Sequence, residues 1–278
     1  MFSIKNVQAE LEAGASLKTV AEAFTDIASI KLKRIRSDIE RNRRFVAEIA
    51  KVYWLVKTEA IKRKVVFSLH KKDTVSILIT SNLRFYGSIN SDLIQNFILS
   101  TSKYKTERVV IGLQGKKYLE DIEYPNPFKS FVFRQDLPDS KDLSDLLAEI
   151  SVYKQILVFY PQMQSVLVQT PTIKDLTQVS STQQEVNSTK EKLDYIFEPE
   201  VEKMIKFFEG QIIITLLEQT FLEGELSRTA ARLISMDMAQ INADKFMKEK
   251  QKELREISRN YTNFRILDSI NNLFSLKK

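Results

Sequence analysis

The residue types that carry catalysis or metal binding are nearly absent from this chain. Its 278 residues include no cysteine and a single histidine, His70, which excludes a thiolate metal site, a catalytic cysteine and any site built on two imidazoles. Glu120 with Glu123, and Asp142 with Asp145, have the spacing of a metal or acid–base pair, but no partner group accompanies them. We therefore interpret these carboxylates and His70 as surface residues and expect no metal and no cofactor.

A phosphate-binding loop is the next chemistry to consider, because GLQGKK at residues 112–117 follows a strand-like stretch. The P-loop needs four residues between its glycines, whereas two separate Gly112 from Gly115. A dinucleotide fingerprint of three spaced glycines is also missing. The sequence therefore predicts that this chain does not bind a nucleotide.

Positive charge is concentrated in one segment. Residues 31–64 contain 12 basic and 4 acidic residues, while the formal net charge of the whole chain is only +6. Basic residues clustered on a helix are typical of a nucleic-acid arm, but these are interleaved with apolar positions and no aromatic platform accompanies them. An acidic protein partner is the favoured interpretation, with the following partner-facing residues: Lys31, Lys33, Arg34, Arg36, Arg41, Arg43 and Arg44.

Both ends of the chain have the pattern of long helices. All six prolines lie between Pro125 and Pro199, so neither end contains a helix breaker. Helices are predicted over about 16–60 and about 211–274, each with a heptad-like apolar seam that only the polar Asn42 and Lys250 interrupt. The first seam contains Phe24, Ala28, Leu32, Ile35, Ile39, Val46 and Ile49, and the second contains Leu233, Met247, Leu254, Ile257, Tyr261 and Phe264.

The economical packing of two such seams is one antiparallel coiled coil that brings the two ends of the chain together. The alternative is two helices of an ordinary bundle.

The sequence between the two long helices predicts strands at 74–80, 108–113, 130–134, 155–160 and 164–170, helices at 91–100 and 140–151, and a polar loop at 177–192. This alternation is typical of a small α/β domain with a largely parallel sheet. We predict an N-terminal coiled-coil helix (1–66), an α/β domain (67–200) and a C-terminal coiled-coil helix (201–278).

Apolar runs are too short to cross a bilayer, which takes about 20 residues, and the N-terminus lacks the apolar core of a signal peptide. We expect no membrane span and a chain that stays in the compartment where it is made.

Four stretches, in register over nearly the whole chain, resemble the gamma subunit of F-type ATP synthases. Residues 21–34 (AEAFTDIASIKLKR) resemble the family's K-A-M-x-M-V-A-A-x-K-x-R, and residues 76–94 resemble its I-T-S-D-R-G-L-C-G-G-x-N. Residues 155–176 are similar to the strand pair that ends in V-Q-x-P. Two more stretches lie in the C-terminal part. FEPEVEKMIKF is similar to the family's F-E-P, and ELSRTAARLISMDMAQINADK is similar to its S-E-x-x-A-R-M-x-A-M-x-x-A-x-x-N-A.

The chain also departs from that family. NLRF at residues 82–85 replaces D-R-G-L, Tyr86 replaces a cysteine and Ser88 a glycine, so a tight turn is altered. Asp26 stands where the family has its second methionine. Thr262 and Asn263 occupy the place of the family's Arg-Gln pair, which grips the catalytic subunit. This suggests a grip that is either weakened or rebuilt around Arg259 and Arg265, with Asn263 also facing the partner.

The resemblance implies a Rossmann-like α/β domain between the coiled-coil helices and a non-catalytic rotor shaft inside a hexamer of alpha- and beta-type subunits. It also implies an epsilon-like subunit and a membrane proteolipid ring as further partners. The protein would be peripheral, on the cytoplasmic side of the cell membrane. Two alternatives stay open: a gamma-like shaft of a specialised F-type-derived motor without the usual proton channel, and a basic coiled-coil nucleic-acid adaptor.

Overall fold

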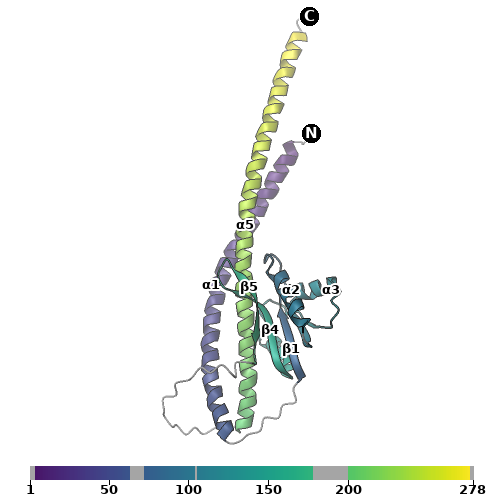
Figure 1. Cartoon of the computed structure of the whole chain (residues 1–278). Helices are drawn as coiled ribbons and strands as arrows, with labels where there is room; N and C mark the ends of the chain where they lie inside the picture. Colours follow the sequence, from purple (N-terminus) through teal and green to yellow (C-terminus); the bar gives the residue numbers. More distant parts are fainter. Residues whose placement is uncertain (1–3, 63–71, 104, 178–199, 276–278) are drawn as a thin grey trace. The chain divides into compact units, whose positions relative to one another are not determined.

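The computed structural model describes residues 4–62, 72–103, 105–177 and 200–275 (Figure 1). Two long helices, α1 (Ile4–Lys62) and α5 (Val201–Ser275), flank a small α/β domain. The elements between them, in chain order, are β1 (Lys72–Ile79), α2 (Ile89–Thr101), β2 (Glu107–Ile111), α3 (Leu113–Asp121), β3 (Lys129–Phe131), α4 (Ser140–Ile150), β4 (Tyr153–Met163) and β5 (Gln169–Asp175).

The sheet has the order β3-β2-β1-β4-β5, and only β5 runs antiparallel to its neighbour. Ile77 at its centre is in register with Val109 on β2 and Val158 on β4. Parallel strands joined through helices bury both faces of a sheet, which explains the β-branched runs in the sequence. The predicted α/β class with a largely parallel sheet is confirmed.

Alternate residues of the strands enter two different cores. Ile77 and Ile79 pack in a cluster with residues of α1, α4 and α5, whereas Leu78 packs on the opposite face with Leu93 and Phe97 of α2. The sheet is therefore a layer between the long helices on one side and α2 and α3 on the other (Figure 1).

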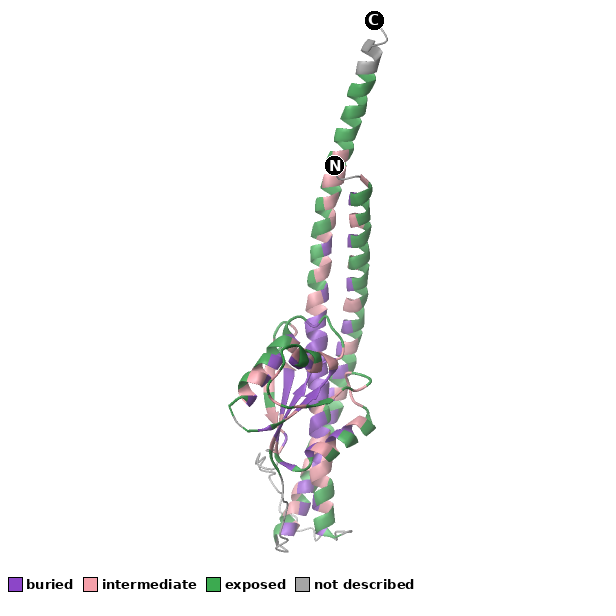
Figure 2. Ribbon diagram, turned by 90° about the vertical axis from the view of Figure 1, so that its right-hand side faces the viewer, coloured by how far each residue is buried: buried purple, intermediate pink, exposed green. Residues whose placement is uncertain are grey.

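The chain divides into two compact units, one comprising Ile30–Ala231 and the other Met1–Ser29 with Arg232–Lys278. In the first unit α1 and α5 pack antiparallel, since Asn42 donates to the carbonyl of Thr215 and Tyr53 to Glu209. Every residue of α5 from 220 to 231 is buried, because α1 covers one side and the sheet the other (Figure 2). This stretch of α5 is the axis of the unit's core.

The second unit is a helix pair. Glu10 pairs with Lys250 at 2.7 Å, Lys18 with Asp244 at 2.8 Å, and Gln240 donates to Thr25 at 2.8 Å, an order that shows antiparallel packing. The interface carries small residues such as Ala21, Ala28 and Ala243, which are buried.

Several boundaries differ from the sequence predictions. Both long helices begin earlier than predicted, and α3 was not predicted at all. The predicted strand at 164–170 is wrong: residues 164–168 form a turn, and β5 follows it. His70 and the predicted loop beyond Thr177 lie outside the described residues, and the three-part division of the chain stays a prediction.

Candidate functional site

The GLQGKK stretch forms the start of α3, and its backbone donors are used within the chain. The N–H of Leu113 donates to Asn82 Oδ1 at 2.9 Å, and that of Gly115 donates to Thr80 Oγ1 at 3.0 Å. Gly112 has φ +97°, and a Cβ there would lie 2.6 Å from the Thr80 carbonyl oxygen. The glycines therefore allow close packing against β1, and the helix start is filled by side chains of this chain.

The carboxylate pairs considered in the sequence have structural roles. Asp142 closes a capping box with Asp139 at the start of α4, and Glu120 lies 3.8 Å from Lys116 one turn earlier on α3. Among the described residues no group of His, Asp or Glu side chains is arranged to hold a metal ion.

The altered turn after β1 is rebuilt around Asp136. Its carboxylate accepts from the backbone N–H of Asn82 at 2.6 Å and from the Tyr86 hydroxyl at 3.1 Å. The Tyr86 side chain is buried with Ile89 and Ala231. Phe85 adopts φ +68°, a conformation that is strained for a residue with a Cβ. The tyrosine therefore fills core volume that a cysteine would leave empty.

The basic residues of α1 separate into two groups. Arg43 donates to Glu223 at 3.2 Å, Arg41 pairs with Asp38 at 2.7 Å on its own helix, and Lys31 pairs with the buried Glu225. Arg44 donates to a backbone carbonyl one turn earlier. Lys31 and Arg43 have counter-charges within the chain, and the partner-facing role of the seven residues stays a prediction.

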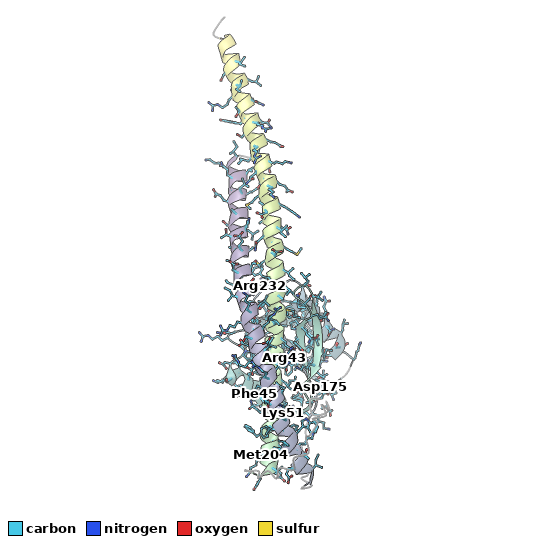
Figure 3. All side chains as sticks on the ribbon, turned by 90° about the vertical axis from the view of Figure 1, so that its left-hand side faces the viewer. Arg43, Phe45, Lys51, Asp175, Met204 and Arg232 are labelled. Carbon is cyan, nitrogen blue, oxygen red and sulfur yellow. The ribbon has the colours of Figure 1, made fainter. Side chains whose placement is uncertain are left out.

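Three exposed cations form the second group: Lys33, Arg34 and Arg36. Within the described ranges none of their side chains has an ion pair or a hydrogen bond. They lie within one turn of α1, about two turns before Arg43, which Figure 3 labels on the same helix. These cations have no counter-charge in the described chain and are available to a partner.

A buried ion pair on α5 was not predicted. Arg228 donates to Glu225 through Nε at 3.2 Å and Nη2 at 3.0 Å, and both side chains are fully buried. Burial acts to raise the pKa of Glu225, but the charges and hydrogen bonds of Arg228 and Lys31 outweigh it and hold that pKa below its ordinary value. The sequence did contain a sign of this ion pair. Arg228 occupies the position at which the gamma-family stretch S-E-x-x-A-R-M has its glutamate.

Glu223 connects three elements. It accepts from Arg43 of α1, from Gln219 of α5 at 2.9 Å and from the Tyr160 hydroxyl of β4 at 2.9 Å. Burial and the neighbouring carboxylate raise the pKa of Tyr160. Lys174 of β5 also faces this carboxylate, and burial lowers its pKa. This network fastens the sheet to both long helices.

Most seam predictions agree with the burial of the side chains. Buried seam residues are Ala28, Leu32, Ile35, Ile39 and Ile49, and partly buried ones are Phe24, Val46, Leu233, Met247, Leu254 and Ile257. Tyr261 and Phe264 are instead 57% and 66% exposed, so they are not buried against α1, and their place in a seam stays a prediction. Glu10 lies opposite Lys250, so the first described turn of α1 lies opposite α5 near Ile257. Beyond Ile257, α5 continues without described residues of α1 beside it.

Residues 258–270 of this continuation of α5 are all exposed. The predicted partner residues Arg259, Asn263 and Arg265 lie on it together with exposed Ile266, Leu267 and Ile270. A helix with apolar side chains all around is typically covered by other protein. No helix among the described residues is long and apolar enough to cross a membrane.

Comparison with known proteins gives a consistent result. A family model described as ATP synthase matches residues 3–257. The ATP synthase gamma chain of Ruthia magnifica is 22% identical over 266 residues, which cover 90% of this chain and 91% of that one. The ATP synthase gamma chain of Fusobacterium nucleatum is 24% identical over 262 residues, covering 89% and 90%.

Solved structures share the fold. A central stalk and c-ring structure of the Tetrahymena thermophila mitochondrial ATP synthase aligns with a TM-score of 0.60 at 18% identity, covering 79% of this chain and 99% of that chain. A rotor structure of the Euglena gracilis mitochondrial ATP synthase aligns with a TM-score of 0.61 at 12% identity, covering 93% and 99%.

Proposed function

This chain belongs to the ATP synthase family as a gamma-type central stalk subunit, and on that basis we propose which partners it binds and through which residues. As the rotor subunit it couples rotation to ATP synthesis or hydrolysis and is itself non-catalytic. Its proposed partners are a hexamer of alpha- and beta-type subunits around the helix pair, an epsilon-like subunit and a membrane proteolipid ring. We place it as a peripheral protein on the cytoplasmic side of the cell membrane.

The observation that carries the residue assignment is the row of unpaired cations on α1. Lys33, Arg34 and Arg36 are exposed and have no counter-charge among the described residues, so acidic loops of the catalytic subunits are a suitable complement. Exposed ion pairs are worth about 0–1 kcal/mol each, so they can break and reform as the shaft turns. On α5 we assign Arg259, Asn263 and Arg265 to the same partners.

Asymmetry of the shaft supplies the mechanism. A pair of unlike helices presents different side chains in different directions, so each catalytic subunit around it meets a different surface. Differences in contact free energy then favour a different conformation in each catalytic subunit. Rotation reassigns these contacts, and by the same linkage a hydrolysis-driven change of conformation turns the shaft.

The test is a charge reversal in the assembled complex. Lys33→Glu, Arg34→Glu and Arg36→Glu together are expected to lower ATP turnover while leaving nucleotide binding by the hexamer unchanged. The matched control reverses three exposed lysines of the α/β domain, Lys117, Lys141 and Lys154, and is expected to turn over normally. Unchanged turnover in the α1 variant would contradict the assignment.

A second candidate, a gamma-like shaft in a specialised F-type-derived motor, is favoured by the rebuilt turn around Asp136 and by Thr262 and Asn263 in place of the Arg-Gln pair. The subunits that copurify with this chain separate the two candidates. Recovery of proteolipid ring subunits supports the conventional enzyme, and a hexamer recovered without them supports the specialised motor.

A further inference from the structure

One polar residue interrupts the buried face of α1. Among the described residues of that helix, Asn42 is the only buried one with an amide or charged side chain, and it is 7% exposed. Its neighbours on the same face, Ile39 and Ile49, are buried and apolar. The helix therefore presents a single buried amide to α5.

This amide makes directional contacts but leaves one of its atoms unpaired. Its Nδ2 donates to the backbone carbonyl of Thr215 at 3.4 Å and to Glu218 Oε2 at 3.2 Å. Its Oδ1 is buried and has no hydrogen-bond partner in the described chain. A buried polar atom without a partner costs free energy, and a leucine of similar volume would not incur this cost. Net stability therefore does not explain an asparagine at this position.

Directional contacts define the position of a helix more sharply than apolar contacts do. An apolar seam with heptad spacing offers similar contacts when one helix slides by a turn, whereas a given hydrogen bond forms at only one position. A single polar residue in a coiled-coil seam specifies the register of the helices at a cost in stability. Asn42 has the properties of such a residue.

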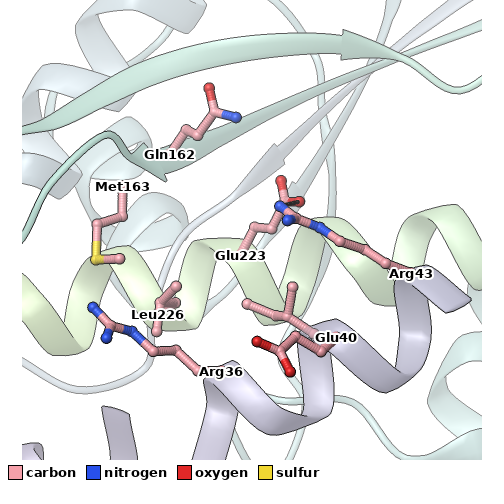
Figure 4. A pocket seen from close by; sticks show the side chains of 8 residues that line it. Arg36, Glu40, Arg43, Gln162, Met163, Glu223 and Leu226 are labelled. Carbon is pink, nitrogen blue, oxygen red and sulfur yellow. Dashed lines mark hydrogen bonds and ion pairs between the residues drawn. The ribbon is translucent and has the colours of Figure 1, made fainter. Parts of the chain in front are cut away.

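Lys31 provides a second polar contact on the same face of α1. It lies 11 residues, or about three turns, before Asn42, so both side chains face α5, where Lys31 pairs with the buried Glu225. Rotating α1 by one residue, about 100°, would turn both side chains away from their partners. Arg43 also donates to Glu223 (Figure 4), but its side chain is long and 61% exposed, so it can make this contact from more than one orientation.

We propose that Asn42 is a positioning residue of the shaft, which fixes the rotation and the axial position of α1 on α5. In this position the exposed cations Lys33, Arg34 and Arg36 face outward, where a partner can reach them. The inference rests on the proposed function and deepens it, because it assigns the orientation of those three cations to one buried amide.

The distance between two spin labels tests this role in the full-length chain. Because the chain has no cysteine, Ala47→Cys on α1 and Lys206→Cys on α5, both at exposed positions, supply the only labelling sites. We expect one narrow distance in the chain with Asn42. In Asn42→Leu we expect a second distance that differs by up to about 5 Å, because one turn advances a helix by that length. The matched control Ile39→Leu, one turn earlier on the same face, should keep one distance.

Two further measurements separate positioning from a merely structural role. The urea midpoint of Asn42→Leu should not fall, since leucine removes an unpaired buried oxygen. The same variant in the assembled complex should turn over ATP more slowly, because in part of the population the three cations no longer face their partners.

A single narrow distance in Asn42→Leu, a fall in its urea midpoint, or a second distance without loss of turnover would overturn the proposal. The distances are measured in this chain alone, so a single distance refutes the role of Asn42 and leaves the rotor function intact. The rotor function is tested separately by the charge reversal of Lys33, Arg34 and Arg36.

Discussion

At the scale of single residues, the strongest constraint is the ion pair inside α5. Glu225 and Arg228 have no exposed side-chain surface, so each depends on the other for the interactions that water would provide, and Glu225 also depends on Lys31. Desolvating two charges is costly, and removing one partner leaves the other buried and uncompensated. We therefore expect that breaking the pair costs more than the intact pair contributes to net stability.

Arg228→Met is expected to lower the free energy of unfolding by about 3 kcal/mol, because Glu225 keeps only the partly exposed Lys31 as a partner. Glu225→Leu combined with Arg228→Met should recover most of this loss, since neither charge of the buried pair then remains. Urea denaturation of the purified chain measures both. A double variant as unstable as Arg228→Met alone would contradict this explanation.

Acid should weaken the same site. The pKa of Glu225 lies below its ordinary 4.5 in the folded chain, so its contribution is fully present above that value and is lost as the pH falls through the folded pKa. Lys31→Met removes one of the two cations that lower this pKa, so the acid-induced loss should begin at a higher pH. Urea midpoints recorded from about pH 7 down to about pH 3 measure this shift, with Lys33→Met as the control. Identical pH profiles for the two variants would contradict the role of Lys31.

At the scale of elements, a glycine decides how α3 joins the sheet. Gly112→Ala should destabilise the fold by about 2 kcal/mol or more, because the new Cβ would clash with the Thr80 carbonyl oxygen and the backbone would stay at positive φ. Gly210→Ala is the control: it lies inside α5 with its nearest neighbour, Leu147 Cδ2, 3.9 Å away, and should stabilise by about 0.5–1 kcal/mol. Thermal unfolding compares them, and a neutral Gly112→Ala would contradict the packing.

The spacing of apolar residues predicts correctly the elements that bury a continuous apolar face. It fails where apolar residues are not part of the core. The buried strands and both long helices could be predicted from it. The turn after β4 was taken for a strand because Val166–Val168 are apolar without being core residues. Tyr261 and Phe264 continue a seven-residue pattern after α1 has ended, and local spacing contains no information about the length of a partner helix.

The candidate site could be predicted only in part, for a related reason. The sequence identifies α1 as basic, but it does not show which of Lys31 and Lys33 faces α5. That depends on how α1 is oriented about its own axis when it packs on α5. Only then does Lys31 meet Glu225 while Lys33 faces outward.

At the scale of the whole molecule, each unit has a distinct character. The unit Ile30–Ala231 has a large core and a buried polar network, which suit a body that turns as one piece. The other unit is a two-helix pair with small apolar contacts, and its α5 continues as a single helix with exposed Phe264 and Leu267. Exposed apolar side chains of this kind are typical of a surface that contacts other protein chains.

Electron cryomicroscopy of the complex purified through this chain tests the central claim most directly. The account predicts that the helix pair formed by residues 4–29 and 232–275 lies along the axis of a ring of six other subunits, with Lys33, Arg34 and Arg36 facing them. A particle in which these helices separate, or in which the chain lies outside any ring, would contradict it.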